Sequence, residues 1–366
     1  MTGDGTGTPD GARGDRPDRR PEAGPDRRSG TRTDERPAAR PRSAREVYRD
    51  LLPGLMGADE RLYCLDSDTG LFERDAFAAV PGRYLNLGIA EHNLMGTAAG
   101  LAASGKMPFV TTMATFAATR ALEFIKIDIA YNALPVRIVA THGGLAAGHL
   151  GPTHHALEDL GIMRMLPGFT VVVPGDARQA EEAVRQSLAL PGPVYIRLGR
   201  GATPDLDGGG PGAAPFEIGR AQWLRPPPGD VALMACGPHP VLAALRAADL
   251  LAARGVRAAV LNLHTPHPLD ADAVLEAAAG ARGVVTVEEH WRSGGLGGAV
   301  AETLAEHAPV RVARIGMPAT FAERAGDQEH LLDRYGITAD AAVAAALKLF
   351  SGTHGGGTDD PCLSRV

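Results

Sequence analysis

The central part of the chain alternates between short apolar runs and longer segments in which apolar residues recur every three or four positions. Runs of about four to eight apolar residues are typical of buried strands, and the longer segments are typical of helices with one buried face. Between residues 45 and 201 the alternation predicts strands at 84–87, 108–113, 136–141, 169–174 and 194–198, with helices from residue 91 and at 117–132 and 177–190. Strands joined by crossover helices pair in parallel, so the pattern predicts an α/β domain with a mainly parallel sheet.

The alternation stops and then starts again, which predicts a second, smaller domain. Residues 202–215 are rich in Gly, Pro and Asp, a composition typical of a linker. Further strands are predicted at 231–236, 257–263, 283–288 and 310–315, and further helices at 240–254, 271–279, 297–307 and 339–350. The expected fold class is therefore α/β, with two domains at 45–201 and 216–350, each built on a mainly parallel sheet.

The two ends of the sequence are unlike its centre. Residues 1–44 contain no Val, Leu, Ile, Phe, Tyr or Trp, and residues 351–366 are rich in Gly. Because such segments bury too little apolar surface to offset chain entropy, we expect a disordered tail at 1–44 and a flexible tail at 351–366. The first tail lacks the apolar run of a signal peptide, and no later segment is apolar enough to cross a bilayer, so we expect a cytosolic protein.

Cysteine usage and charge favour small-molecule chemistry. Cys64, Cys236 and Cys362 are widely spaced and odd in number, which supports neither a disulfide framework nor a cysteine-based metal site. A formal net charge of −6 gives no reason to expect nucleic-acid binding.

One carboxylate stands out at a junction between a predicted strand and a predicted helix. Gly88 permits a tight turn after the strand at 84–87, and the helical spacing of Leu94, Ala98 and Leu101 places Glu91 in the first helical turn. An acid in this position faces the positive end of the helix dipole. Glu91 is therefore either a helix cap or a functional acid in apolar surroundings.

Other polar and aromatic residues lie at or after the ends of predicted strands, where open α/β sheets bind ligands. Phe116 follows the strand at 108–113, and the Gly-rich loop at 141–155 carries four histidines: His142, His149, His154 and His155. Their spacing matches no standard zinc pattern, so we expect no metal in this chain and interpret them as residues of a polar substrate channel.

Two arginines lie at and just after the C-terminal end of the strand predicted at 194–198. Arg197 and Arg200 are each able to bind a phosphate through two parallel hydrogen bonds. The local sequence does not separate this role from a salt bridge to an acid of the linker.

Four motifs together resemble the C-terminal half of a transketolase: GIAEHNL at 88–94, ATF at 114–116, GPTHH at 151–155 and VEEHWRSGGLGG at 287–298. The resemblance covers residues 45–350 and implies an aminopyrimidine-binding domain at 45–201 followed by a transketolase C-terminal domain at 216–350. It also implies thiamine diphosphate as cofactor and transfer of a two-carbon ketol unit from a ketose, often phosphorylated, to an aldehyde. The chain would thus be a transferase.

The resemblance assigns expected roles to nine residues. Glu91 would contact the aminopyrimidine ring of the cofactor, Phe116 would stack on it, and Leu87 and Ile89 would help to exclude water. The remaining residues would face the substrate: His142 and His154 its hydroxyl groups and reacting oxygens, and Arg45 and Arg200 its phosphate, with Arg197 as a close competitor of Arg200.

Part of the family pattern is absent. Transketolases of one chain carry an earlier GDG…N motif that holds Mg²⁺ and the diphosphate, and here the only GDG triplet, at residues 3–5, lies in the expected tail. The chain therefore resembles the small subunit of a split transketolase. We expect a partner polypeptide with the GDG…N motif and the Mg²⁺ site, and a homodimer of this chain within an α2β2 complex.

Two departures from the family pattern suggest a specialised substrate. Leu150 stands where transketolases usually have an Asp that binds a substrate hydroxyl, and Gly143 replaces the usual Asp after His142. The alternatives are a β-subunit of a 2-oxo-acid dehydrogenase, a deoxyxylulose-phosphate-synthase-like enzyme, or a non-catalytic partner of a thiamine enzyme.

Overall fold

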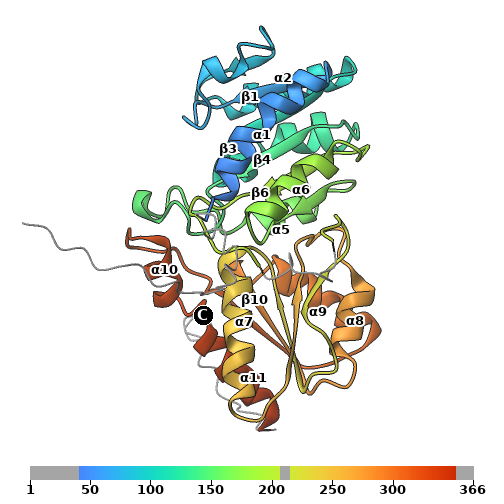
Figure 1. Cartoon of the computed structure of the whole chain (residues 1–366), viewed down its shortest axis with the longest axis vertical. Coiled ribbons are helices and arrows are strands. Elements are labelled where there is room, and N and C mark those ends of the chain that lie inside the picture. Colours follow the sequence, from blue (N-terminus) through green and yellow to red (C-terminus); the bar gives the residue numbers. More distant parts are fainter. Residues whose placement is uncertain (1–40, 207–214, 352–366) are drawn as a thin grey trace, which may run out of the picture. The chain divides into compact units, whose positions relative to one another are not determined.

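The computed structural model describes residues 41–206 and 215–351 (Figure 1). The tails expected at 1–44 and 351–366 lie almost entirely outside these residues, as do Cys362, the GDG triplet and most of the expected linker. The boundary expected at residue 44 is corrected, because Ser43 caps a helix that begins at Ala44. Its hydroxyl accepts from the Glu46 backbone N–H, and the Glu46 carboxylate accepts from the Ser43 backbone.

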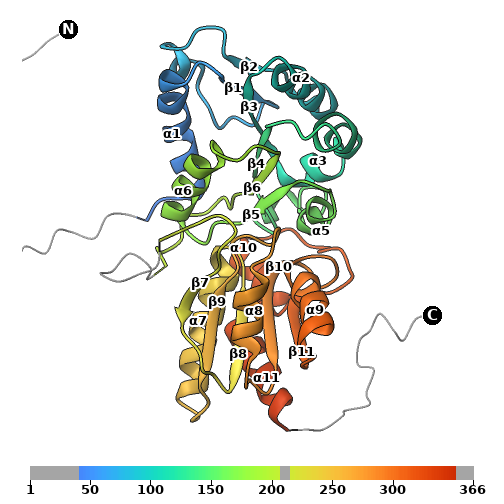
Figure 2. The same ribbon diagram turned by 90° about the vertical axis from the view of Figure 1, so that its right-hand side faces the viewer.

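The first sheet has six parallel strands in the order β2-β1-β3-β4-β6-β5. The strands are β1 (Leu62–Asp66), β2 (Tyr84–Asn86), β3 (Met107–Met113), β4 (Arg137–Thr141), β5 (Thr170–Val172) and β6 (Val194–Arg197). Figure 2 shows α1 (Ala44–Ala58) and α6 (Ala177–Ser187) on one side of this sheet, and α2 (Glu91–Ala103), α3 (Ala114–Ala118) and α5 (Asp159–Arg164) on the other.

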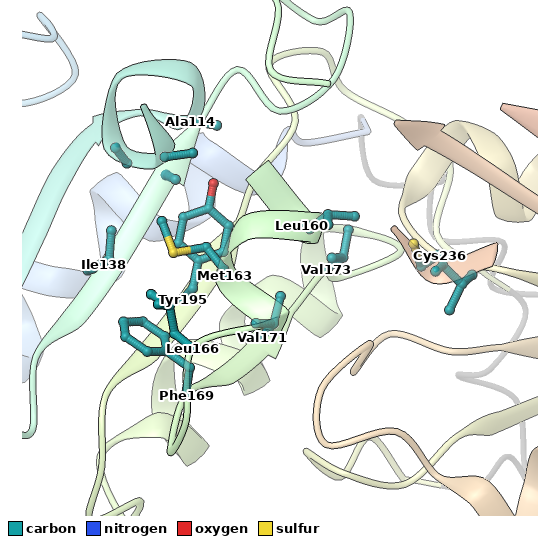
Figure 3. Close-up of a cluster of buried hydrophobic side chains, with 14 of the residues drawn as sticks. Ala114, Ile138, Leu160, Met163, Leu166, Phe169, Val171, Val173, Tyr195 and Cys236 are labelled. Carbon is teal, nitrogen blue, oxygen red and sulfur yellow. The ribbon is translucent and has the colours of Figure 1, made fainter. Parts of the chain in front are cut away.

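Neighbouring strand residues point to opposite faces of this sheet and so feed two hydrophobic clusters. Phe109 and Val139 belong to the cluster under α1 and α6, whereas Val110 and Ile138 belong to the cluster under α2, α3 and α5. In Figure 3 the second cluster includes Ile138, Val171 and Tyr195 from the strands, packed with side chains of α5 and the turn after it. Because both faces are covered, most residues of these strands are apolar and buried.

The second sheet has five strands in the order β11-β10-β8-β9-β7. They are β7 (Gln222–Arg225), β8 (Val231–Ala235), β9 (Ala258–Asn262), β10 (Val284–Trp291) and β11 (Val312–Met317), and all pairs are parallel except β7 with β9. The helices are α7 (Pro238–Ala252), α8 (Ala271–Ala278), α9 (Leu296–His307), α10 (Gln328–Arg334) and α11 (Ala339–Phe350). The α/β fold with mainly parallel sheets is thus confirmed.

The helix predicted at 117–132 is wrong as a continuous element. The segment is divided into α3, the short α4 (Leu122–Phe124) and a π-helical turn at Ile125–Ala130. The Thr119 hydroxyl donates to the Thr115 carbonyl at 2.6 Å, and the N–H groups of Arg120 and Ala121 both donate to the Phe116 carbonyl. These competing bonds replace the regular helical pattern and turn the chain just after Phe116.

The two sheets belong to one compact unit and are joined by specific hydrogen bonds. Val171 and Val173 donate backbone bonds of 2.7 Å to the carbonyls of His267 and His264. The Glu289 carboxylate accepts from the Leu145 N–H at 2.6 Å. The loop after β4 is therefore anchored to the end of β10.

Candidate functional site

Glu91 is the first residue of α2, directly after β2 and a turn at Gly88, whose φ of +72° favours glycine. The whole residue is only 1% exposed, so its carboxylate lies in the protein interior. It does not cap α2. Within the described residues its side chain instead accepts a hydrogen bond from Arg120, at 2.8 Å to Oε2. The capping alternative therefore does not account for this acid.

Phe116 contacts the same arginine as Glu91 does. The guanidinium carbon of Arg120 is 4.5 Å from the centroid of the Phe116 ring, within the range of cation–π contacts. The ring of His154 approaches Phe116 edge-on, with 5.3 Å between centroids. The structure thus brings together three residues singled out in the sequence, Glu91, Phe116 and His154.

Arg120 is the member of this group that sequence reasoning missed. It follows Phe116 by four positions, which is the spacing of side chains on one helical face, and it is the sole charged residue in the stretch 107–122. A single charge in an otherwise uncharged stretch was the feature of the sequence that could have identified Arg120. Its acidic partner lies 29 residues earlier in the chain, on a different element.

Leu87 and Ile89 differ in their surroundings. Leu87 is partly buried and packs against the core, whereas Ile89 is 72% exposed. An exposed Ile89 excludes water only where another surface covers it.

A second group of polar residues surrounds a cavity of about 430 Å³. Its lining includes Arg45 at the start of α1, His149 in the loop after β4, Arg200 after β6, and Gln328 at the start of α10. Arg200 donates from Nη1 to Nδ1 of His149 at 3.1 Å. Burial and the charge of Arg200 lower the pKa of Arg45 from its usual value, so an anion placed between the two guanidinium groups would be stabilised.

His142 lies close to this cationic cavity, at the end of β4. Its φ of 59° is unusual for a residue with a side chain and fixes the direction in which the imidazole leaves the strand. The Nδ1 atom lies 2.9 Å from the Thr141 hydroxyl. Burial, together with the charges of Arg45 and Arg200, lowers the pKa of His142 to about 4, so its ring is neutral at neutral pH.

Arg197 is placed differently from Arg200. It is only 5% exposed, and its Nε donates to Asp159 Oδ2 at 2.9 Å, while Nη2 donates to the carbonyls of Ala156 and Glu289. The salt bridge considered from the sequence thus exists, but with an acid of α5 instead of the linker. These donors are committed inside the chain, which favours Arg200 over Arg197 as an anion ligand.

Arg197 also explains why Gly143 lacks a side chain. A Cβ at Gly143 would lie 2.6 Å from Arg197 Nε and 2.7 Å from its Cγ. The buried guanidinium therefore occupies the space that an Asp at this position would need.

Leu150 is 46% exposed and is not a lining residue of the 430 Å³ cavity. His149, directly before it, takes the place beside Arg200. Of these two neighbouring residues, only His149 lines the cavity.

The segment 287–298 contacts the first domain through His290, whose Nε2 accepts from the Gly161 N–H at 3.2 Å, and is held together by its own hydrogen bonds. Glu288 accepts from the N–H groups of Leu296 and Gly297 at the start of α9, at 2.7 and 2.9 Å. A Cβ at Gly295 would lie 2.1 Å from Glu288 Oε2, which accounts for glycine there. This motif serves the architecture and does not contribute to the Glu91 cluster.

A further acid, Glu158, lines a separate cavity of about 300 Å³ with Thr115, Thr119 and Phe321. Burial raises its pKa from the usual value. Nothing in the local sequence around Glu158 distinguishes it from an ordinary surface acid.

Within residues 41–206 and 215–351, no group of three or more His, Cys, Asp or Glu side chains is arranged to hold a metal ion. The same residues include no helix that is long and apolar enough to span a membrane. Cys64 and Cys236 are buried free thiols.

Comparison with known proteins identifies the family. The family model described as transketolase, pyrimidine binding domain, matches residues 40–205, and the model for the transketolase C-terminal domain matches residues 219–341. A 6-deoxy-6-sulfo-D-fructose transketolase subunit of Clostridium sp. (strain MSTE9) is 40% identical over 304 residues, which are 82% of this chain and 92% of the relative.

The chain belongs to the transketolase family.

Two other relatives are a transketolase subunit and a split-gene transketolase. An apulose-4-phosphate transketolase subunit of Phocaeicola vulgatus is 36% identical over 308 residues, 84% of this chain and 97% of the relative. A solved split-gene transketolase, an inactive β4 tetramer, superposes with a TM-score of 0.74 at 40% identity and covers 84% of this chain and 98% of its own. The resemblance expected from the four motifs is confirmed, including the similarity to split transketolase subunits.

Proposed function

We propose that this chain is the smaller subunit of a split transketolase, which transfers a two-carbon ketol unit from an anionic ketose to an aldehyde acceptor. The observation that carries the proposal is that one arginine, Arg120, contacts both the buried carboxylate of Glu91 and the ring of Phe116. A buried acid and an aromatic face are the two groups that an aminopyrimidine ring requires, one to hydrogen-bond a ring nitrogen and one to stack. These residues fit the thiamine diphosphate on which the family depends.

The proposed roles follow from placement. When bound, thiamine diphosphate supplies the carbanion chemistry that takes up and releases the two-carbon unit. Glu91 would hold the aminopyrimidine end and exchange a proton with it, and Phe116 would fix the plane of the ring. His154, which contacts Phe116, and the neutral His142 are the groups that would exchange hydrogen bonds and protons with substrate oxygens.

The cavity between Arg45 and Arg200 is the proposed site for the anionic end of the substrate. Two guanidinium groups on one cavity attract a phosphate or a sulfonate, and the acid of the same lining, Asp327, already accepts from the His330 N–H at 2.7 Å. The names of both relatives include a sugar with an anionic group of this kind: a 6-deoxy-6-sulfo-fructose in one and an apulose-4-phosphate in the other. Because Leu150 offers no hydrogen-bond acceptor, the phosphate or sulfonate would contribute more to substrate binding than hydroxyl recognition would.

The same proposal includes a partner polypeptide. Since residues 41–206 and 215–351 hold no cluster of acidic side chains suited to a metal ion, the diphosphate and its Mg²⁺ would be bound by a subunit with the GDG…N motif in an α2β2 complex. Calorimetry tests this requirement: the full chain alone should show no tight, Mg²⁺-dependent binding of thiamine diphosphate. Tight binding to the isolated chain would contradict the split arrangement.

The experiment that tests the role of Glu91 is a Glu91→Gln exchange in the reconstituted complex. Ketol transfer should fall by roughly 10²- to 10⁴-fold, the usual contribution of a positioned acid or base. Glu123→Gln, which changes an acid on α4 outside the site, is the matched control and should retain activity. A Glu91→Gln complex with full turnover would show that the carboxylate is structural and would favour a non-catalytic partner.

A further inference from the structure

Arg120 occupies the space beside the two groups on which the proposed function rests. Its Nη1 atom lies 2.8 Å from Glu91 Oε2, and its guanidinium carbon lies 4.5 Å from the centroid of the Phe116 ring. A guanidinium is planar and rich in donors, so here it makes one hydrogen bond to the carboxylate and one stacking contact with the ring. An aminopyrimidine, also planar, would need the same carboxylate and an aromatic face.

We propose that Arg120 is an internal competitor of the cofactor, which closes the aminopyrimidine site in the empty subunit and leaves it when the cofactor binds. This inference rests on the proposed function and adds a residue that regulates the same site. The Arg120 guanidinium and the aminopyrimidine would bind Glu91 and Phe116 in alternation.

The different burial of the two partners supports this exchange. The Glu91 side chain is 2% exposed and the Arg120 side chain 41% exposed. A buried carboxylate without a partner is costly, so the empty site requires a cation at this place. Arg120, by contrast, has a solvent path and loses little when its guanidinium moves into water.

The local backbone supports the same conclusion. The break after α3, caused by the Thr119 hydroxyl bond to Thr115, ends the helix just before Arg120. Arg120 therefore lies on a short turn between α3 and α4 and not within a continuous helix. Its side chain is able to change direction without disturbing the stacking residue Phe116.

The first test measures affinity in the reconstituted complex. Titration calorimetry with thiamine diphosphate at saturating Mg²⁺ should give a Kd that is roughly three- to tenfold lower for Arg120→Met than for the unchanged complex. In this variant the ion pair with Glu91, of which only the arginine is partly exposed, and the cation–π contact with Phe116 no longer compete with the cofactor ring. Inorganic pyrophosphate is the control ligand, because it lacks the ring, and its Kd should not change. Arg185→Ala, which removes an exposed arginine paired within α6, is the control variant.

The second test uses the full chain without cofactor. Arg120→Met should lower the melting temperature, and the double variant Glu91→Gln/Arg120→Met should recover part of the loss, because a neutral amide needs no cationic partner. Arg120→Gln, which keeps a planar donor without charge, provides a second variant if Arg120→Met folds poorly. It should lower the thiamine diphosphate Kd by a smaller factor.

The outcomes separate this inference from the proposed function. If the unchanged complex does not bind thiamine diphosphate, the proposed function fails. If it binds, and both Arg120 variants bind the cofactor equally or more weakly, then Arg120 supports the cofactor or is uninvolved, and the competition is refuted.

Discussion

Arg197 and Arg200 lie three residues apart, but replacing each of them by Ala should impair a different property of the protein. Arg200 is exposed and contacts His149 beside the cationic cavity, whereas Arg197 is buried and paired with Asp159, which is 0% exposed. Arg200→Ala should therefore impair substrate binding, and Arg197→Ala should impair folding. Neither residue can substitute for the other, because each is held by different partners.

The magnitudes follow from these contacts. Loss of a charge-assisted hydrogen bond costs about 1.5 to 3 kcal/mol, and because Arg45 remains in the cavity, we expect the lower end for Arg200→Ala, a rise of roughly tenfold in KM for a ketose phosphate. Removing one member of a buried ion pair costs about 3 to 5 kcal/mol, so Arg197→Ala should lower the free energy of unfolding by that amount.

Two assays separate the effects. Steady-state kinetics of the reconstituted complex gives KM and kcat, and urea unfolding of the full chain gives stability. An Arg200→Ala variant with unchanged KM would remove this residue from the anion site. A stable Arg197→Ala variant with a strongly raised KM would reverse the assignment of the two arginines.

Other substitutions test further parts of the site and fold. His149→Glu should raise KM for anionic ketoses in the same kinetic assay. The imidazole nitrogen of His149 lies 3.1 Å from Arg200, so a carboxylate in its place would compete with the substrate anion. An unchanged KM would argue against the cavity as anion site. Thermal unfolding should show that stability falls as the pH drops from about 6.5 to about 4, because His142 stays neutral in the folded chain while the same residue binds a proton in the unfolded chain. An identical pH profile for His142→Gln would show that His142 is not the cause of this loss of stability. Gly295→Ala should lower the melting temperature because of the 2.1 Å approach to a carboxylate, whereas Gly54→Ala, in an open helical position, should leave it equal or higher; similar effects of both would refute the packing argument.

The buried strands and long helices were predictable because their residues carry strong local patterns. The helix predicted at 339–350 matches α11, and the strand predicted at 108–113 differs from β3 by one residue. β1 and β7 were not predicted. β1 includes Cys64 and Asp66 within its five residues, and β7 is a partly exposed edge strand of four residues that begins with Gln222 and ends with Arg225, so neither resembles a continuous Val and Ile run.

The site was predictable at the level of motifs and not at the level of partners. Glu91 and Phe116 were identified because each lies in a recognisable local segment. The contact of Arg120 with Glu91 and that of Arg197 with Asp159 join residues 29 and 38 positions apart, and only the folded chain determines them. The space beside Gly143, filled by Arg197, is likewise invisible in a local sequence pattern.

The most direct measurement is product analysis of the complex formed by this chain and a polypeptide with the GDG…N motif, given thiamine diphosphate, Mg²⁺, a ketose phosphate and an aldehyde acceptor. The account predicts a new ketose that is two carbons longer than the acceptor, formed without release of carbon dioxide, and lost when Glu91 is replaced by Gln. Carbon dioxide release from pyruvate without any transfer from the ketose phosphate would contradict it and would identify a keto-acid enzyme instead.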